Sequence, residues 1–174
     1  MSKPALPDGL VVVVKRDCET CQTVVPALRQ LADAAELTVY TQDDPDFPGD
    51  PAAIHDADLA VSWHHDIETV PTLIEVVDGI ETRRTFGWLQ TEWREFTGID
   101  DLGEGLPPMR PGCGSKSVDP DLVDELAVRH GGSVLRSRRI EVAEAEDEIE
   151  LMFNRGWTDG LPVVPATEER VIRM

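Results

Sequence analysis

The strongest constraint on the fold of this chain is an apolar run near its N-terminus. Residues 10–14 are a leucine followed by four valines. Valine is β-branched and favours extended backbone, and a strand that is apolar throughout needs cover on both faces. Helices supply that cover when helices and strands alternate along a chain. The run therefore predicts an α/β domain around a strand that is buried on both sides.

The residues on either side of this run alternate between helical and extended patterns. The first expected elements are a helix over residues 18–35 kinked by Pro26, a strand over 37–41, a loop over 43–51 and a short helix over 51–63. The next are a strand over 72–77, an Asp78-Gly79 turn, a strand over 80–86 and a helix over 90–96. This order predicts a four-stranded mixed sheet, β-α-β-α-β-β-α, with helices on both faces.

A pair of cysteines, Cys18 and Cys21, stands where the first helix is expected to begin. Thiols two residues apart can close a disulfide with little backbone movement, and a helix N-terminus favours a thiolate. A metal would need two further ligands, and the sequence has no second C-x-x-C. The pattern therefore predicts a redox dithiol and no metal site, with an inactive remnant of such a site as the alternative.

The motifs around this pair resemble those of the thioredoxin family. Pro26 lies five residues after Cys21, residues 69–73 (Thr-Val-Pro-Thr-Leu) resemble the family's cis-proline motif, and Asp78-Gly79 and Gly87 fall where the family has a turn and a later glycine. The resemblance covers nearly all of residues 9–98. It implies a thioredoxin-like domain over residues 1–98.

The resemblance also implies roles for individual residues. Cys18 would attack a disulfide and Cys21 would resolve the resulting mixed disulfide. Val70 and Pro71 would shape the substrate groove, with a cis peptide bond before Pro71; the alternative is an ordinary trans proline at the start of a strand. No cofactor is implied, since the chain has no complete phosphate-loop motif.

Three residues depart from the family pattern. Asp17 replaces a tryptophan, Glu19-Thr20 replace Gly-Pro, and Val12 stands where the family has a buried acid. Two carboxylates beside Cys18 should raise the pKa of its thiol, although two basic residues precede them. The sequence thus predicts a thiol that is less acidic than that of a strong oxidase, which favours a reductant or a transfer protein.

The remainder of the chain differs in composition from residues 1–98. Residues 99–118 are rich in Pro and Gly, which predicts a linker, and within it Cys113 is a candidate accessory thiol that exchanges with the dithiol. The alternative is a linker cysteine without a role. Residues 119–174 form a mostly helical extension, with helices expected over 119–129, over 143–155 and from 167, and an ambiguous segment over 134–142.

The extension has narrow apolar stripes, so we expect it to pack on the first domain or on a larger partner subunit. Its residues 155–165 resemble the start of a larger, uncharacterised domain, so the chain could be a fragment or one subunit of a pair.

Charge and cysteine content limit the partners. The formal net charge is −18, which disfavours nucleic acid, and no stretch is long and apolar enough to predict a membrane span. Few cysteines and no signal-peptide pattern predict a cytoplasmic protein.

His64 and His65 are expected to cap a helix at the surface rather than to bind a metal.

The sequence as a whole predicts a thiol–disulfide oxidoreductase that uses Cys18 and Cys21 to reduce or exchange disulfides or oxidised sulfur on a dedicated client. The client is either a protein or a low-molecular-weight thiol or disulfide. The alternative is a non-catalytic structural subunit that docks a larger catalytic partner through residues 119–174.

Overall fold

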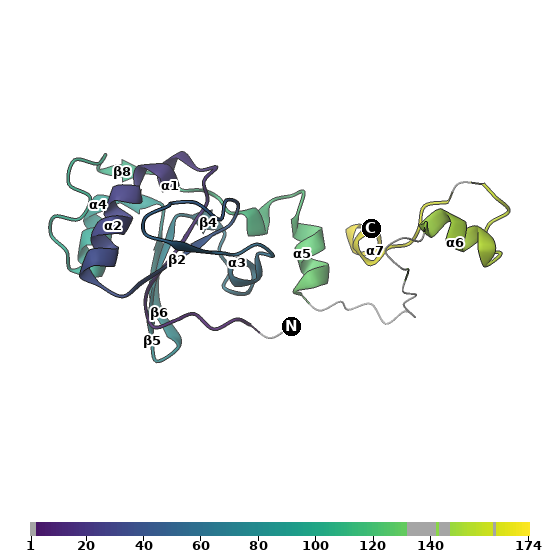
Figure 1. Ribbon diagram of the computed structural model, residues 1–174, viewed down its shortest axis with the longest axis horizontal. Coiled ribbons are helices and arrows are strands. Elements are labelled where there is room, and N and C mark those ends of the chain that lie inside the picture. The colour runs from purple at the N-terminus through teal and green to yellow at the C-terminus, as the bar shows by residue number, and fades with distance from the viewer. Residues whose placement is uncertain (1–2, 132–141, 143–146, 162) are drawn as a thin grey trace.

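A computed structural model describes residues 3–131, 142, 147–161 and 163–174 (Figure 1). Its main body is an α/β unit around a five-stranded mixed sheet in the order β3-β2-β1-β5-β6. The strands are β1 (Gly9–Val14), β2 (Leu37–Thr41), β3 (Ala53–His55), β5 (Thr72–Val77) and β6 (Ile80–Phe86).

The central strand of this sheet is β1, as the valine run predicts. It runs parallel to β2 and antiparallel to β5, with Val12 opposite both Val39 and Leu73. The side chains of residues 11–14 have no exposed surface. The prediction of a strand buried on both faces is confirmed.

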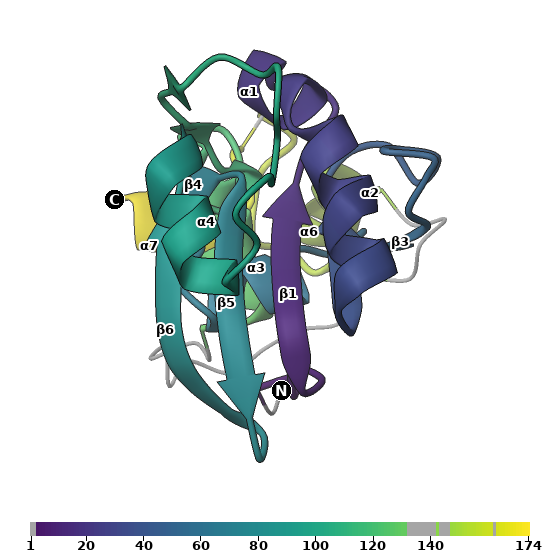
Figure 2. The ribbon, with the colours of Figure 1, turned by 90° about the vertical axis from the view of Figure 1, so that its left-hand side faces the viewer.

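Helices cover both faces of the sheet. Figure 2 shows α2 (Val25–Ala34) and α4 (Gln90–Thr97) in front of β1 and β5, with α3 (Ala60–His64) behind. The single helix expected over residues 18–35 is divided into α1 (Glu19–Thr23) and α2, and Pro26 lies in the first turn of α2. A proline is tolerated there because the first N–H groups of a helix have no partner within the helix.

The predicted number of strands is wrong by one. Residues 51–63 were expected to form a single short helix, but they contain β3 at the sheet edge, where Tyr40 is opposite Ile54, followed by α3. The strand has only three residues and leaves Ile54 and His55 exposed, so it carries no alternating apolar pattern. Its position is set by pairing with β2 rather than by its own sequence.

The segment with linker composition is packed across one end of the sheet. Its β8 (Met109–Arg110) pairs with β7 (Trp88–Leu89), and its β9 (Cys113–Gly114) pairs with β4 (Thr69–Val70). A short 3-10 helix, η1 (Lys116–Val118), follows. We call residues 107–116 the strap. The division of the chain at residues 98 and 118 stays a prediction.

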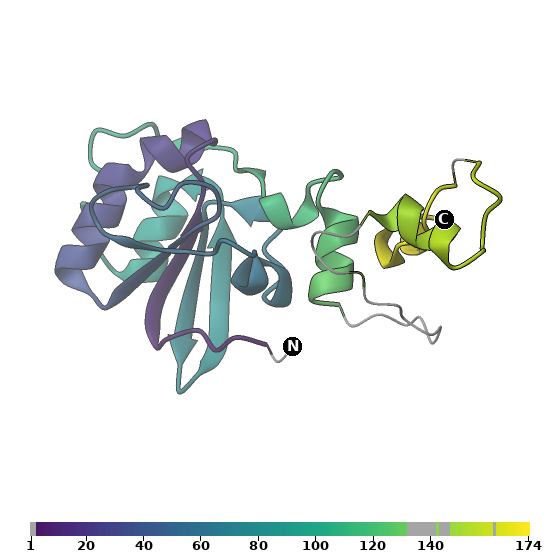
Figure 3. The same cartoon turned by 45° about the vertical axis from the view of Figure 1, so that its right-hand side comes forward.

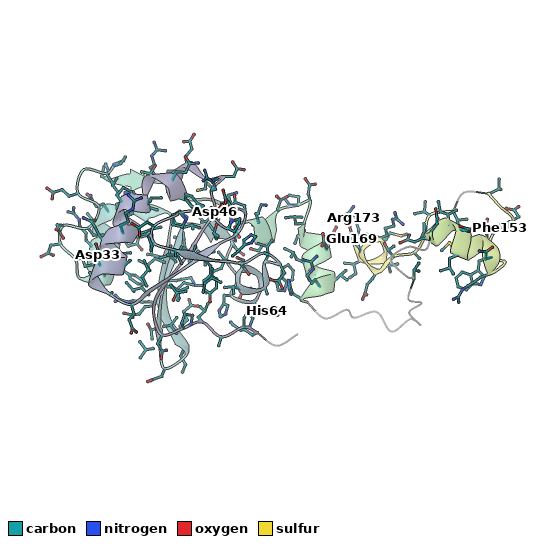
Figure 4. All side chains as sticks on the ribbon, viewed as in Figure 1. Asp33, Asp46, His64, Phe153, Glu169 and Arg173 are labelled. Atoms are coloured by element: carbon teal, nitrogen blue, oxygen red, sulfur yellow. The ribbon has the colours of Figure 1, made fainter. Side chains whose placement is uncertain are left out.

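The C-terminal extension contains α5 (Val123–Arg129), α6 (Glu148–Asn154) and α7 (Glu168–Arg173). Figure 3 shows α6 and α7 extending away from the sheet. The side chain of Arg173 lies 2.7 Å from Asp124 and 3.0 Å from Glu169, which ties α7 to α5 (Figure 4). The ambiguous segment over 134–142 lies almost entirely outside the described residues, as do residues 143–146 at the start of the helix expected over 143–155.

Candidate functional site

The two thiols of the C-x-x-C lie at the start of α1. Cys18 is the N-cap residue, with extended backbone, and its Sγ accepts a hydrogen bond from the Cys21 N–H at 3.3 Å. A side chain at this position meets backbone N–H groups that have no partner within the helix. Both cysteines are free, and both are buried, with 3% of Cys18 and none of Cys21 exposed.

Strand β4, which ends at Val70 just before Pro71, lies directly beside Cys18. The Val70–Pro71 peptide bond is cis, and both residues are buried. In its protonated form the Cys18 thiol donates to the carbonyl oxygen of Val70 at 3.6 Å. The dithiol and the proline motif, which are far apart in the sequence, therefore meet at one place.

The strap brings Cys113 to the same place. Cys113 is opposite Val70 in the antiparallel pairing of β9 with β4, and Gly114 is opposite Thr69. Its side chain is half-buried. All five candidate residues are thus brought together, namely Cys18, Cys21, Val70, Pro71 and Cys113.

The strap is held directly over α1. The Thr20 hydroxyl donates to the carbonyl oxygen of Pro111 at 2.6 Å, and Arg110 lies 3.3 Å from the Glu19 carboxylate. Next to these contacts the backbone of Gly112 passes close to Gly87: a Cβ on Gly112 would lie 3.3 Å from the Cα of Gly87. The same Cβ would lie 2.2 Å from Thr69 Cγ2, so a side chain at this position would displace its neighbours.

A buried polar cluster holds the other end of the strap. The Gln42 side-chain amide donates to the hydroxyls of Ser62 and Ser115 at 2.8 and 2.6 Å, and its oxygen accepts from the Lys116 N–H at 3.0 Å. The anchoring roles of Thr20 and Gln42 were not predicted from the sequence. A polar residue just after a predicted strand gives no signal of burial, because its partners lie far away in the sequence.

Hydrogen bonds around the Cys18 sulfur stabilise its thiolate. Donation from the Cys21 thiol, and to a smaller extent from the Cys113 thiol and from backbone N–H groups, lowers the pKa of Cys18 to about 5 against the opposing effect of burial. Burial raises the pKa of Cys21 and of Cys113, and their hydrogen bonds to Cys18 act in the same direction. One thiolate is therefore surrounded by two protonated thiols.

The neighbouring carboxylates were expected to raise the pKa of Cys18, but they are not among the groups that shift it. The Glu19 side chain is 87% exposed and pairs with Arg110, and Asp17 is exposed. Solvent and the arginine screen these charges. The strap, whose position is not evident from the sequence, instead contributes the Cys113 thiol, which lowers the pKa of Cys18. The comparison with a strong oxidase stays a prediction.

The histidine pair does not form a surface cap. His65 is buried, and its Nε2 lies 2.8 Å from the carbonyl oxygen of Pro4. Burial lowers the pKa of His65, which favours the neutral ring. Within the described residues no group of three or more His, Cys, Asp or Glu side chains could hold a metal ion, and no helix is long and apolar enough to cross a membrane.

Comparison with protein-family models and with curated proteins gives no match to this chain.

Proposed function

We propose that the chain is a thioredoxin-like thiol–disulfide oxidoreductase with Cys18 as the attacking thiol and Cys21 as the resolving thiol. The observation that carries the proposal is the Cys18 sulfur, which lies at the N-terminus of α1 among hydrogen-bond donors and next to the carbonyl of Val70. The strand–helix–strand order of β1, α1, α2 and β2 supports the same assignment.

The proposed reaction transfers two electrons to a client disulfide. The Cys18 thiolate attacks one sulfur of the client, and the other client sulfur leaves as a thiolate. Cys21 then loses its proton and attacks Cys18 Sγ, which releases the second client sulfur. The client gains two electrons, and its two sulfurs take up the proton lost by Cys21 and one proton from water. The protein keeps a Cys18–Cys21 disulfide. A reducing compartment such as the cytoplasm would regenerate the dithiol.

The proposal is tested by titrating the ultraviolet absorbance of the thiolate in the reduced protein. We expect a thiolate that is lost as the pH falls through about 5, because the pKa of Cys18 is lowered. Cys18→Ser should remove this transition. Cys21→Ala should move it to higher pH, because it removes the largest stabilising hydrogen bond. A wild-type protein with no thiolate below pH 7 would refute the proposed role of Cys18.

A second candidate is a non-catalytic subunit that docks a larger partner through residues 119–174. It is supported by the 3% exposure of Cys18 and by apolar side chains that the extension leaves exposed, such as Phe153 and Trp157. Complementation distinguishes the two candidates. If a Cys18→Ser, Cys21→Ser double variant restores the full phenotype of a host that lacks the protein, the structural role is favoured.

A further inference from the structure

The strap occupies the surface where an extended client would be expected to bind. Peptides that bind by strand addition use the free backbone groups of a strand edge. At the β4 edge those groups face β9, with Val70 opposite Cys113, and the adjoining Glu68 carbonyl accepts a hydrogen bond from the Ser115 N–H at 2.9 Å. A segment of the chain itself thus takes the place of a client strand.

The strap residue near Cys18 is Cys113, which carries a thiol. The Cys18 sulfur lies 3.6 Å from the carbonyl oxygen of Val70. Cys113 is the residue opposite Val70 in the pairing of β4 with β9. The Cys113 thiol is also among the groups that lower the pKa of Cys18. It is half-buried, whereas Cys21 is fully buried within α1. Cys113 therefore has the position that the cysteine of a client would take.

We propose that Cys113 is a second resolving thiol, which acts when a small disulfide reaches Cys18 with the strap in place, and that this oxidation closes a Cys18–Cys113 disulfide that locks the strap over the site. The inference rests on the proposed function, because it requires Cys18 to be the attacking thiol. It assigns a role to a residue outside the C-x-x-C pair. It also predicts that the oxidised form has its groove closed to protein clients.

The oxidant in this step is a low-molecular-weight disulfide. The Cys18 thiolate attacks one of its sulfurs, which forms a mixed disulfide and releases one small thiolate. Cys113 gives up its proton and attacks Cys18 Sγ, which breaks the mixed disulfide and releases the second small thiolate. Two protein thiols become one disulfide, and the small disulfide becomes two thiols.

Peptide mapping can identify the disulfide that forms. The reduced full-length protein is treated with oxidised glutathione, the remaining thiols are alkylated at low pH, and the protein is digested with trypsin. Cys18 and Cys21 share the peptide 17–29, whereas Cys113 lies in the peptide 95–116, because the bond between Arg110 and Pro111 resists trypsin. The expected product is a disulfide-linked pair of these two peptides in which Cys21 is alkylated.

Two variants and one control accompany the mapping. Cys21→Ala should still form the linked pair, and Cys113→Ala should give only a disulfide within peptide 17–29. Oxidation in denaturant should largely abolish the linked pair, because the juxtaposition depends on the fold. A linked pair that forms equally well in denaturant would overturn the inference.

The remaining outcomes separate this inference from the proposed function. A wild-type protein that forms only the Cys18–Cys21 disulfide, with Cys113 alkylated, overturns the inference and leaves the proposed function intact. A stable glutathione adduct on Cys18 also overturns it. If Cys18 forms neither an adduct nor a disulfide, the proposed function fails together with the inference.

Discussion

The strap and the C-terminal tail, residues 147–174, differ in how they relate to the sheet. The tail is rich in large apolar side chains, yet neither α6 nor α7 has a buried residue, and Phe153 lies far from the sheet (Figure 4). The strap is mostly Pro, Gly and polar residues, yet Ser115 is buried and both of its short strands are paired. Strand pairing with β4 and β7 and hydrogen bonds from polar side chains, rather than apolar content, hold the strap in place.

The largest effect is expected when a tryptophan of the main α/β body is compared with one of the tail. Trp93 is fully buried, and its indole N–H donates to the carbonyl oxygen of Gly87 at 3.1 Å, whereas Trp157 is 50% exposed. Trp93→Ala should lower the free energy of unfolding by about 3–5 kcal/mol because it leaves a cavity. Trp157→Ala should change it by less than about 0.5 kcal/mol. Urea denaturation of both variants measures the difference.

A large effect of Trp157→Ala would mean that the tail is bound to another surface in solution, and the contrast between strap and tail would then be lost.

The next largest effect is expected where the strap crosses the sheet. A Cβ on Gly112 would lie 2.2 Å from Thr69 Cγ2 and 3.0 Å from the Val70 carbonyl oxygen. Gly112→Ala should therefore displace the strap, lower the free energy of unfolding by about 1–3 kcal/mol and speed the alkylation of Cys18. The alkylation rate is followed by mass spectrometry of the peptide 17–29.

Gly114 is the matched control, because it lies on the same strap and a Cβ there would meet nothing within 4 Å. Gly114→Ala should leave both quantities close to wild type. Equal effects of the two substitutions would show that the crossing at Gly112 does not hold the strap in place.

The smallest effect is expected for the exposed ion pair between strap and helix. Arg110 lies 3.3 Å from Glu19, and the arginine side chain is 40% exposed. Surface pairs contribute at most about 1 kcal/mol, so Arg110→Gln should change the free energy of unfolding by less than that and leave the pKa of Cys18 near 5. A marked rise of that pKa would mean that charge, rather than the thiol and backbone donors, stabilises the thiolate.

The sequence was informative where local pattern and burial agree. The runs that form β1, β2, β5 and β6 are β-branched or alternating, and each was predicted within a residue of its observed bounds. The short edge strand at Ala53–His55 was missed, because pairing with a neighbour rather than its own pattern makes it extended.

The site was predictable only in part. Cys18, Cys21, Val70 and Pro71 were chosen from motifs, but the groups that lower the pKa of Cys18 were not foreseen. The sequence places Asp17 and Glu19 next to the thiol and Cys113 far from it, whereas the fold turns the carboxylates outward and brings Cys113 inward. Proximity that depends on strand register cannot be obtained from spacing along the chain.

The pairing of the strap with β4 also has a kinetic consequence. Under the proposed function, a client of protein size reaches Cys18, which is 3% exposed, only after the strap has detached. Opening then becomes a first-order step that precedes a second-order one. At high client concentration the rate of mixed-disulfide formation should reach a plateau set by the frequency of strap detachment, which is a property of this chain and not of the client.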